Sequence, residues 1–79
     1  MKNPASIKAF GVHIRRLREE RNLSQQALAD LADLARKTVV RIENGDGTTF
    51  DVLVSLARGL EIPLEELVKF PLPKEKKRG

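Results

Sequence analysis

Hydrophobic residues recur at intervals of three and four along the first third of the chain. The stripe consists of Ile7, Phe10, Ile14 and Leu17. Residues at this spacing share one face of an α-helix. The pattern predicts a first helix that is capped at Ser6, ends at about Arg21 or Asn22, and packs on a core through this face. Residues 1–5, which include Pro4, are expected to form a flexible N-terminal arm.

The next stretch, residues 23–45, predicts two short helices joined by a sharp turn. Ser24 is a good N-cap for a run of helix formers that falters at residues 33–34. Helical periodicity then resumes over residues 35–44, and Gly45 favours the end of that helix.

The later of these two helices has two different faces. At about 100° per residue, its cations Arg36, Lys37 and Arg41 share one arc with Val40 and Asn44. The opposite side is apolar and consists of Ala35, Val39 and Ile42. A helix with this pattern packs its apolar side on a small core and offers its cationic side, which carries no acid, to a polyanion.

The same stretch resembles the helix-turn-helix domains of the phage-repressor and Cro class, often called the XRE family. The resemblance covers about residues 10–67 and rests on spaced residues: Leu23-Ser24-Gln25, Leu28-Ala29, Leu34, Arg36, Val39, Arg41-Ile42-Glu43 and Asn44-Gly45. The family usually has Gly at the position of Asp33 and Ser or Thr at that of Ala35. Asp tolerates the left-handed conformation, whereas Ala35 provides no side chain to cap the helix that follows.

Two further helices are expected after the motif. Thr48 or Thr49 caps the fourth, whose apolar stripe consists of Phe50, Leu53, Leu56, Ala57 and Leu60. Pro63 starts the fifth, from which Leu64, Leu67 and Val68 pack back on the core. The expected fold is thus an all-α, compact five-helix repressor-like domain over residues 6–70, with the helix-turn-helix formed by helices 2 and 3. Residues 71–79 are too poor in apolar groups to order themselves and predict a disordered basic tail.

Composition narrows the function classes. A chain of 79 residues makes one small domain. Without cysteine it has no disulfide, and with His13 as its only histidine it offers no metal site, so we expect no metal and no cofactor. No catalytic set or P-loop occurs, which argues against an enzyme. No apolar run reaches the length of a membrane span, and the expected location is the cytoplasm.

Charge is segregated along the chain. The net charge of +4 divides into +4 over residues 1–45, −3 over residues 46–70 and +3 over residues 71–79. The cations therefore accompany the helix-turn-helix and the tail, and this segregation favours nucleic acid as the partner over the alternative of a merely solvated surface.

The resemblance implies a role for each motif residue, with double-stranded DNA as the partner. In repressors the third helix enters the major groove and the second crosses the phosphate backbone. The expected base contacts are Arg36, Lys37, Val40 and Arg41, and the expected phosphate contacts are Ser24, Gln25 and Asn44. Each cation has a phosphate contact as its alternative role, and Val40 has that of an incidental surface residue.

Arg18 falls on the apolar side of the first helix, about 20° from Ile7 at helical spacing. A cation there needs a carboxylate, and Glu43 lies near the core edge of the third helix. In related family domains an Arg and a Glu at these positions pair across the core. We therefore expect a structural ion pair between Arg18 and Glu43.

The predicted function is that of a sequence-specific transcriptional regulator that binds a palindromic operator as a dimer. Apolar residues without an obvious place in the core are Leu31, Phe70 and Leu72. Of these, Phe70 and the fifth helix are the expected homodimer contact. The alternative function is a protein-interaction module, such as the antitoxin partner of a toxin.

Overall fold

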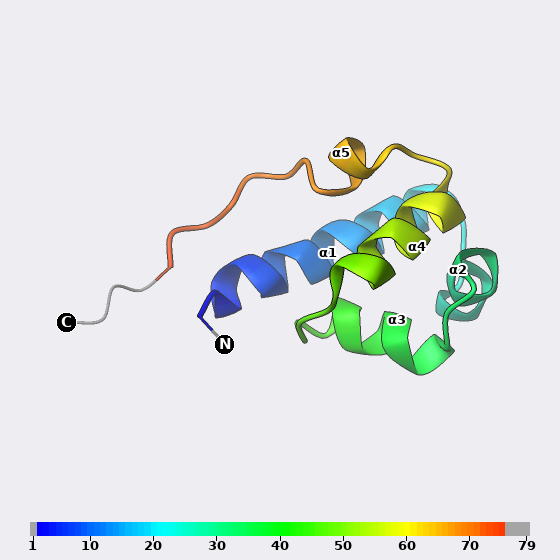
Figure 1. Ribbon diagram of the computed structural model, residues 1–79, viewed down its shortest axis with the longest axis horizontal. Coiled ribbons are helices and arrows are strands. Elements are labelled where there is room, and N and C mark those ends of the chain that lie inside the picture. Colours follow the sequence, from blue (N-terminus) through cyan, green and yellow to red (C-terminus); the bar gives the residue numbers. More distant parts are fainter. Residues whose placement is uncertain (1, 76–79) are drawn as a thin grey trace.

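The computed structural model describes residues 2–75, which form five α-helices and no strand. The helices are α1 (Pro4–Glu20), α2 (Gln25–Ala32), α3 (Arg36–Glu43), α4 (Phe50–Leu60) and α5 (Leu64–Leu67). α2 packs against both α3 and α4, and α1 packs against α3 (Figure 1). This confirms the expected all-α, five-helix architecture with α2 and α3 as the motif. No helix in the described range is long and apolar enough to cross a membrane.

Every helix contributes to one core. The core cluster consists of the buried apolar residues Ile14, Leu28, Ala29, Val39, Ile42, Leu56, Ala57, Leu60 and Leu67. Phe10 and Leu17 pack against them from α1 and remain partly exposed. Ile14 of the α1 stripe and Val39 and Ile42 of the α3 stripe therefore face the core, and their packing fixes the orientation of α3. Ala35, which was expected on the same side of α3, is its N-cap and is exposed.

The turn inside the motif accommodates both departures from the family pattern. Asp33 ends α2 in the left-handed conformation, with φ of 56°. The Ser24 hydroxyl oxygen accepts a hydrogen bond from the Ala27 amide at 3.0 Å, which confirms the predicted cap of α2. Ala35 is the N-cap of α3 and makes no side-chain hydrogen bond there.

The start of α1 differs from the prediction, because the helix begins at Pro4 and not after a cap at Ser6. Proline is favoured at this position because it has no amide to satisfy and its φ is already helical. The next two amides, of Ala5 and Ser6, donate to the carboxylate of Glu75 at 3.1 and 2.7 Å. Hydrogen bonding to Ser6 is the main cause that lowers the pKa of the Glu75 carboxyl.

The described part of the tail therefore returns to the start of α1 (Figure 1). The prediction of an arm over residues 1–5 is wrong for residues 4–5, which are helical. Met1 of the predicted arm and residues 76–79 of the predicted tail lie outside the described residues.

Besides Ala35, two residues expected in the core are exposed. Phe50 is 67% exposed because it is the first residue of α4, just after the cap at Thr49. Val68 is 45% exposed because α5 begins at Leu64, with Pro63 as its N-cap, and ends before Val68. A four-residue helix completes about one turn, so the residue that follows it no longer shares the buried side of Leu67.

Phe70 was expected to have no obvious place in the core, but it packs on α1 of its own chain. Its ring lies 5.8 Å from that of Phe10 and is stacked on that of His13 at 5.1 Å. Leu31 and Leu72, by contrast, are 58% and 69% exposed. Residues 68–75, which we call the strap, thus cover part of α1.

Gly11 allows α1 and α3 to approach closely. A methyl group at this position would collide with the carbonyl oxygen of Ile42 and lie 3.1 Å from that of Glu43. Both oxygens belong to the backbone of α3, so neither can rotate away. Any side chain at position 11 would push α3 outward.

We expect Gly11→Ala to lower the free energy of unfolding by about 1 to 2 kcal/mol, because overpacking outweighs the gain in helix propensity. Urea denaturation would measure this change. Arg16→Ala, an exposed substitution on the same helix, is the control and should stay within about 0.5 kcal/mol of the wild type. A Gly11→Ala variant as stable as the wild type would contradict the close packing of α1 on α3.

Candidate nucleic-acid interface

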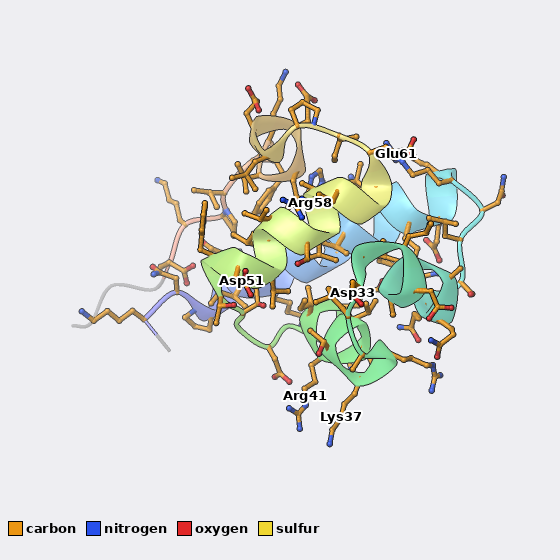
Figure 2. The ribbon with its side chains drawn as sticks, turned by 45° about the vertical axis from the view of Figure 1, so that its right-hand side comes forward. Asp33, Lys37, Arg41, Asp51, Arg58 and Glu61 are labelled. Atoms are coloured by element: carbon orange, nitrogen blue, oxygen red, sulfur yellow. The ribbon has the colours of Figure 1, made fainter. Side chains whose placement is uncertain are left out.

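α3 carries the cationic surface that its sequence pattern predicts. Val39 and Ile42 are buried, whereas Arg36, Lys37 and Arg41 are exposed. The side chains of Lys37 and Arg41 project from the same side of the molecule, away from the other helices (Figure 2). The burial of its apolar side therefore leaves α3 with a cationic front.

The expected base contacts occupy different places on this front. Arg36 and Lys37 are the first two residues of α3, and Arg41 is in its last turn. Val40 is half-buried and offers only part of its side chain. Since Ala35 gives no side-chain cap, the N-terminal turn of α3 is open to an external acceptor.

The three expected phosphate contacts lie at the two ends of the motif. Ser24 is exposed at the start of α2, and its hydroxyl proton is still free to donate because its oxygen is the acceptor in the cap. Asn44 is exposed and follows the last residue of α3. Gln25 is half-buried, and its side-chain amide donates to Glu43 Oε1 at 3.2 Å.

The structure brings Arg18 and Glu43 together in a buried, two-pronged ion pair. Arg18 Nε donates to Glu43 Oε2 at 2.7 Å, and Arg18 Nη2 donates to Glu43 Oε1 at 3.0 Å. The two side chains are 10% and 3% exposed. The hydrogen bond to Glu43 is the main cause that raises the pKa of Arg18, against the opposing effect of burial.

This pair is the centre of a network that joins three helices. Arg18 Nη1 also donates to the Leu23 carbonyl oxygen at 2.7 Å, just before the cap of α2. Gln25 joins from α2 through Glu43. The network holds the start of α2 against the end of α3, and it therefore sets the spacing between the expected phosphate contacts and the cationic front.

Sequence reasoning missed the bond from Gln25 to Glu43. It assigned Gln25 to phosphate alone, and no spacing rule connects residues on two helices joined by a turn. One hydrogen of the Gln25 side-chain amide is used in this bond, and the other remains available to a phosphate.

Another region of the surface carries charges of both signs. Arg58 of α4 and Glu61 at its end lie on the side opposite Lys37 and Arg41 (Figure 2). Within residues 2–75, no group of three or more His, Cys, Asp or Glu residues is arranged to hold a metal ion. The cationic front of α3 is the candidate site for an anionic partner.

Comparison with known proteins agrees with this geometry. The helix-turn-helix family model HTH_3 matches residues 14–67. A solved structure, that of the restriction-modification controller protein C.AhdI from Aeromonas hydrophila, is similar with a TM-score of 0.76 and 36% sequence identity. The match covers 80% of this chain and 97% of the controller protein. No curated protein gives a significant match.

Proposed function

The chain belongs to the helix-turn-helix family of DNA-binding regulators, and we propose that it recognises a specific operator through α3. The observation that carries this proposal is the cationic front of α3, held rigidly by its buried back. A cationic helix of this size suits the major groove, whose floor presents base edges and whose walls are phosphates.

The residues of the motif have two separate roles, contacts to bases and contacts to phosphates. Arg36, Lys37 and Arg41 contact base edges, since Arg and Lys match the paired O6 and N7 acceptors of guanine. Val40 meets a thymine methyl group with the exposed part of its side chain. Phosphate contacts fix the register of the domain and come from Ser24, Gln25 and Asn44.

The likeness to a restriction-modification controller supports a finer proposal, that this chain also regulates genes of a restriction-modification system. An antitoxin that binds a toxin through α3 would need apolar or acidic residues on the front of that helix. Its exposed residues there are cations, which favours DNA. This function needs no catalytic residue, metal or cofactor, and it is carried out in the cytoplasm, where the DNA lies.

We further propose that the regulator acts as a homodimer through α5 and Phe70. One domain reads about four or five base pairs, whereas a two-fold dimer reads two half-sites about 34 Å apart. Around the partly exposed Phe70 lie the exposed apolar residues Val68 and Leu72. A contact there leaves the cationic front of α3 free for DNA.

The dimer is tested by Val68→Ser and Phe70→Ser. Each should weaken self-association about tenfold, since truncation of a central interface residue costs about 1 to 2 kcal/mol. Sedimentation with and without a palindromic duplex measures this change. Val68→Ser is the cleaner variant, because Phe70 also packs on Phe10 and His13. Leu31→Ser, a similarly exposed substitution on α2, is the control. A wild type that stays monomeric on the duplex would refute the dimer.

Selection of bound sequences from a random DNA pool tests the function itself. We expect enrichment of a palindrome with half-sites about one helical turn apart. Recovery of sequences without any common site would count against an operator-specific regulator.

A further inference from the structure

The described end of the strap is fastened to the N-terminus of α1. The two oxygens of the Glu75 carboxylate accept hydrogen bonds from the amides of Ala5, at 3.1 Å, and Ser6, at 2.7 Å. An α-helix leaves the amides of its first turn unpaired, and its dipole favours a negative charge beside them. Glu75 therefore satisfies two donors of α1 and holds the strap where these donors lie.

This anchor is separate from the contact of Phe70 with α1. Phe70 packs on Phe10 and His13, whereas Glu75 bonds to the first turn of the helix. Leu72, which lies between the two attachments, is 69% exposed. The strap is thus attached at two places, and the loss of the Glu75 carboxylate would free the stretch that follows Phe70.

The start of α1 lies beside the edge of the DNA-binding motif. A methyl group added to Gly45, in the turn after α3, would lie 3.5 Å from the Cα atom of Lys8. Ala5 and Ser6 precede Lys8 by no more than one turn of helix, about 5 Å along its axis. Figure 1 accordingly shows the start of α1 and the turn between α3 and α4 on the same side of the molecule. Glu75 is therefore held near the end of α3, at the border of the cationic front.

The residues that follow this anchor are rich in cations. Positions 76–79 are Lys-Lys-Arg-Gly and contain no acid. Because a chain advances at most about 3.6 Å per residue, the Cα atoms of Lys76, Lys77 and Arg78 cannot lie further than about 11 Å from that of Glu75. Measured from Phe70, the same limit is about 29 Å. The anchor thus restricts these cations to the neighbourhood of the motif.

We propose that Glu75 is a positioning residue that directs Lys76, Lys77 and Arg78 to the phosphates of DNA beside the half-site of α3. This inference rests on the proposed function, in which α3 occupies the major groove. Phosphates bind lysine and arginine regardless of base sequence, so the anchored cations add affinity and salt dependence but no base preference. Because effective concentration falls with tether length, the short tether from Glu75 favours these contacts over the longer one from Phe70.

The salt dependence of operator binding tests the contact between these cations and phosphate. A triple-glutamine variant combines Lys76→Gln, Lys77→Gln and Arg78→Gln. It should reduce the slope of log affinity against log salt by about 2 to 3, since each phosphate contact contributes about 0.9. It should also weaken binding by more than about tenfold at about 0.1 M salt, equally for all duplexes.

Glu75→Ala isolates the anchor when it is made in two backgrounds. In the wild type it lengthens the tether of Lys77 from two residues to seven, and it also removes a negative charge, which strengthens binding. In the triple-glutamine variant the effect of the charge alone remains. The two effects on affinity should therefore differ about sixfold, from the roughly −3/2 power dependence on tether length. Glu65→Ala, which removes an exposed acid from α5, is the matched control and should act equally in both backgrounds.

Equal effects of Glu75→Ala in the two backgrounds would show that Glu75 does not position the cations. An unchanged slope in the triple-glutamine variant would show that the cations do not meet phosphates, and either result overturns the proposal. Base preference separates these outcomes from a failure of the proposed function, which stands if Arg41→Ala alters that preference. If Arg36→Ala and Arg41→Ala both leave base preference unchanged, the proposed function itself fails.

Discussion

Arg18→Met is expected to lower the free energy of unfolding by about 3 to 5 kcal/mol, because it leaves the Glu43 carboxylate buried without its charge partner. The Glu43 side chain is only 3% exposed, and its carboxylate accepts two hydrogen bonds from Arg18. The bond from Gln25 alone cannot compensate for this loss, since it comes from a neutral amide at 3.2 Å. Chemical denaturation of the wild type and the variant measures the change.

The double-mutant cycle separates the pair from its surroundings. Glu43→Leu should destabilise the fold by a similar amount, whereas Arg18→Met combined with Glu43→Leu should cost much less than the sum. Arg15→Ala is the control for the loss of a cation on α1, because Arg15 is exposed and its partner among residues 2–75 is the exposed Glu19 at 3.6 Å. Strictly additive losses from the two single variants would refute the coupling.

Arg41→Ala is expected to weaken binding to the preferred operator by about 1 to 3 kcal/mol and to relax the preference at one base pair. The exposed Arg41 side chain lies in the last turn of α3 and projects away from the other helices (Figure 2). Its loss removes the proposed base contact and leaves the buried back of α3 intact. Titration of the operator and of single-base variants measures both effects.

Gln25→Ala provides the contrast, because the contact proposed for Gln25 is to phosphate, which carries no sequence information. It should weaken binding to all of these duplexes alike. The variant also loses the bond to Glu43, so its free energy of unfolding is measured alongside. A loss of affinity confined to one base pair would show that Gln25 reads sequence instead.

The parts of the fold that could be predicted are those where one helix face must be buried. Val39 and Ile42 occupy one side of α3, and the exclusion of apolar groups from water determines which way that side faces. Arg18 was identified as an interior residue by its place in an apolar stripe. Its partner, Glu43, was predicted from the family resemblance. Periodicity indicates which side of a helix a residue occupies, but it does not identify the residue that contacts it from another helix.

The parts that could not be predicted depend on contacts between distant segments. Glu75 bonds to the first amides of α1 across about seventy positions of sequence, and no local pattern indicates that pairing. Phe70 was assigned outside the core because it follows the last helix, yet the strap carries it back to Phe10 and His13. Phe50 had the correct spacing for the core stripe but lies too close to the start of α4 to be covered.

The candidate site shows the same division. The exposed cations of α3 followed from amphipathic spacing alone. The contact of Lys8 with the turn after α3 was not predicted, because it depends on how α1 crosses that turn. The roles of individual residues toward bases or phosphates stay predictions, since they depend on how the domain docks on DNA.

The most direct test of α3 as the reading helix compares the DNA sequences selected by the wild type with those selected by Arg36→Ala and Arg41→Ala. Both positions are exposed on the cationic front, so the variants should fold as the wild type does. We expect each variant to lose preference at a different base pair of the half-site, while preference at the remaining positions is retained. Unchanged selected sequences for both variants would contradict the assignment of α3 as the helix that reads DNA.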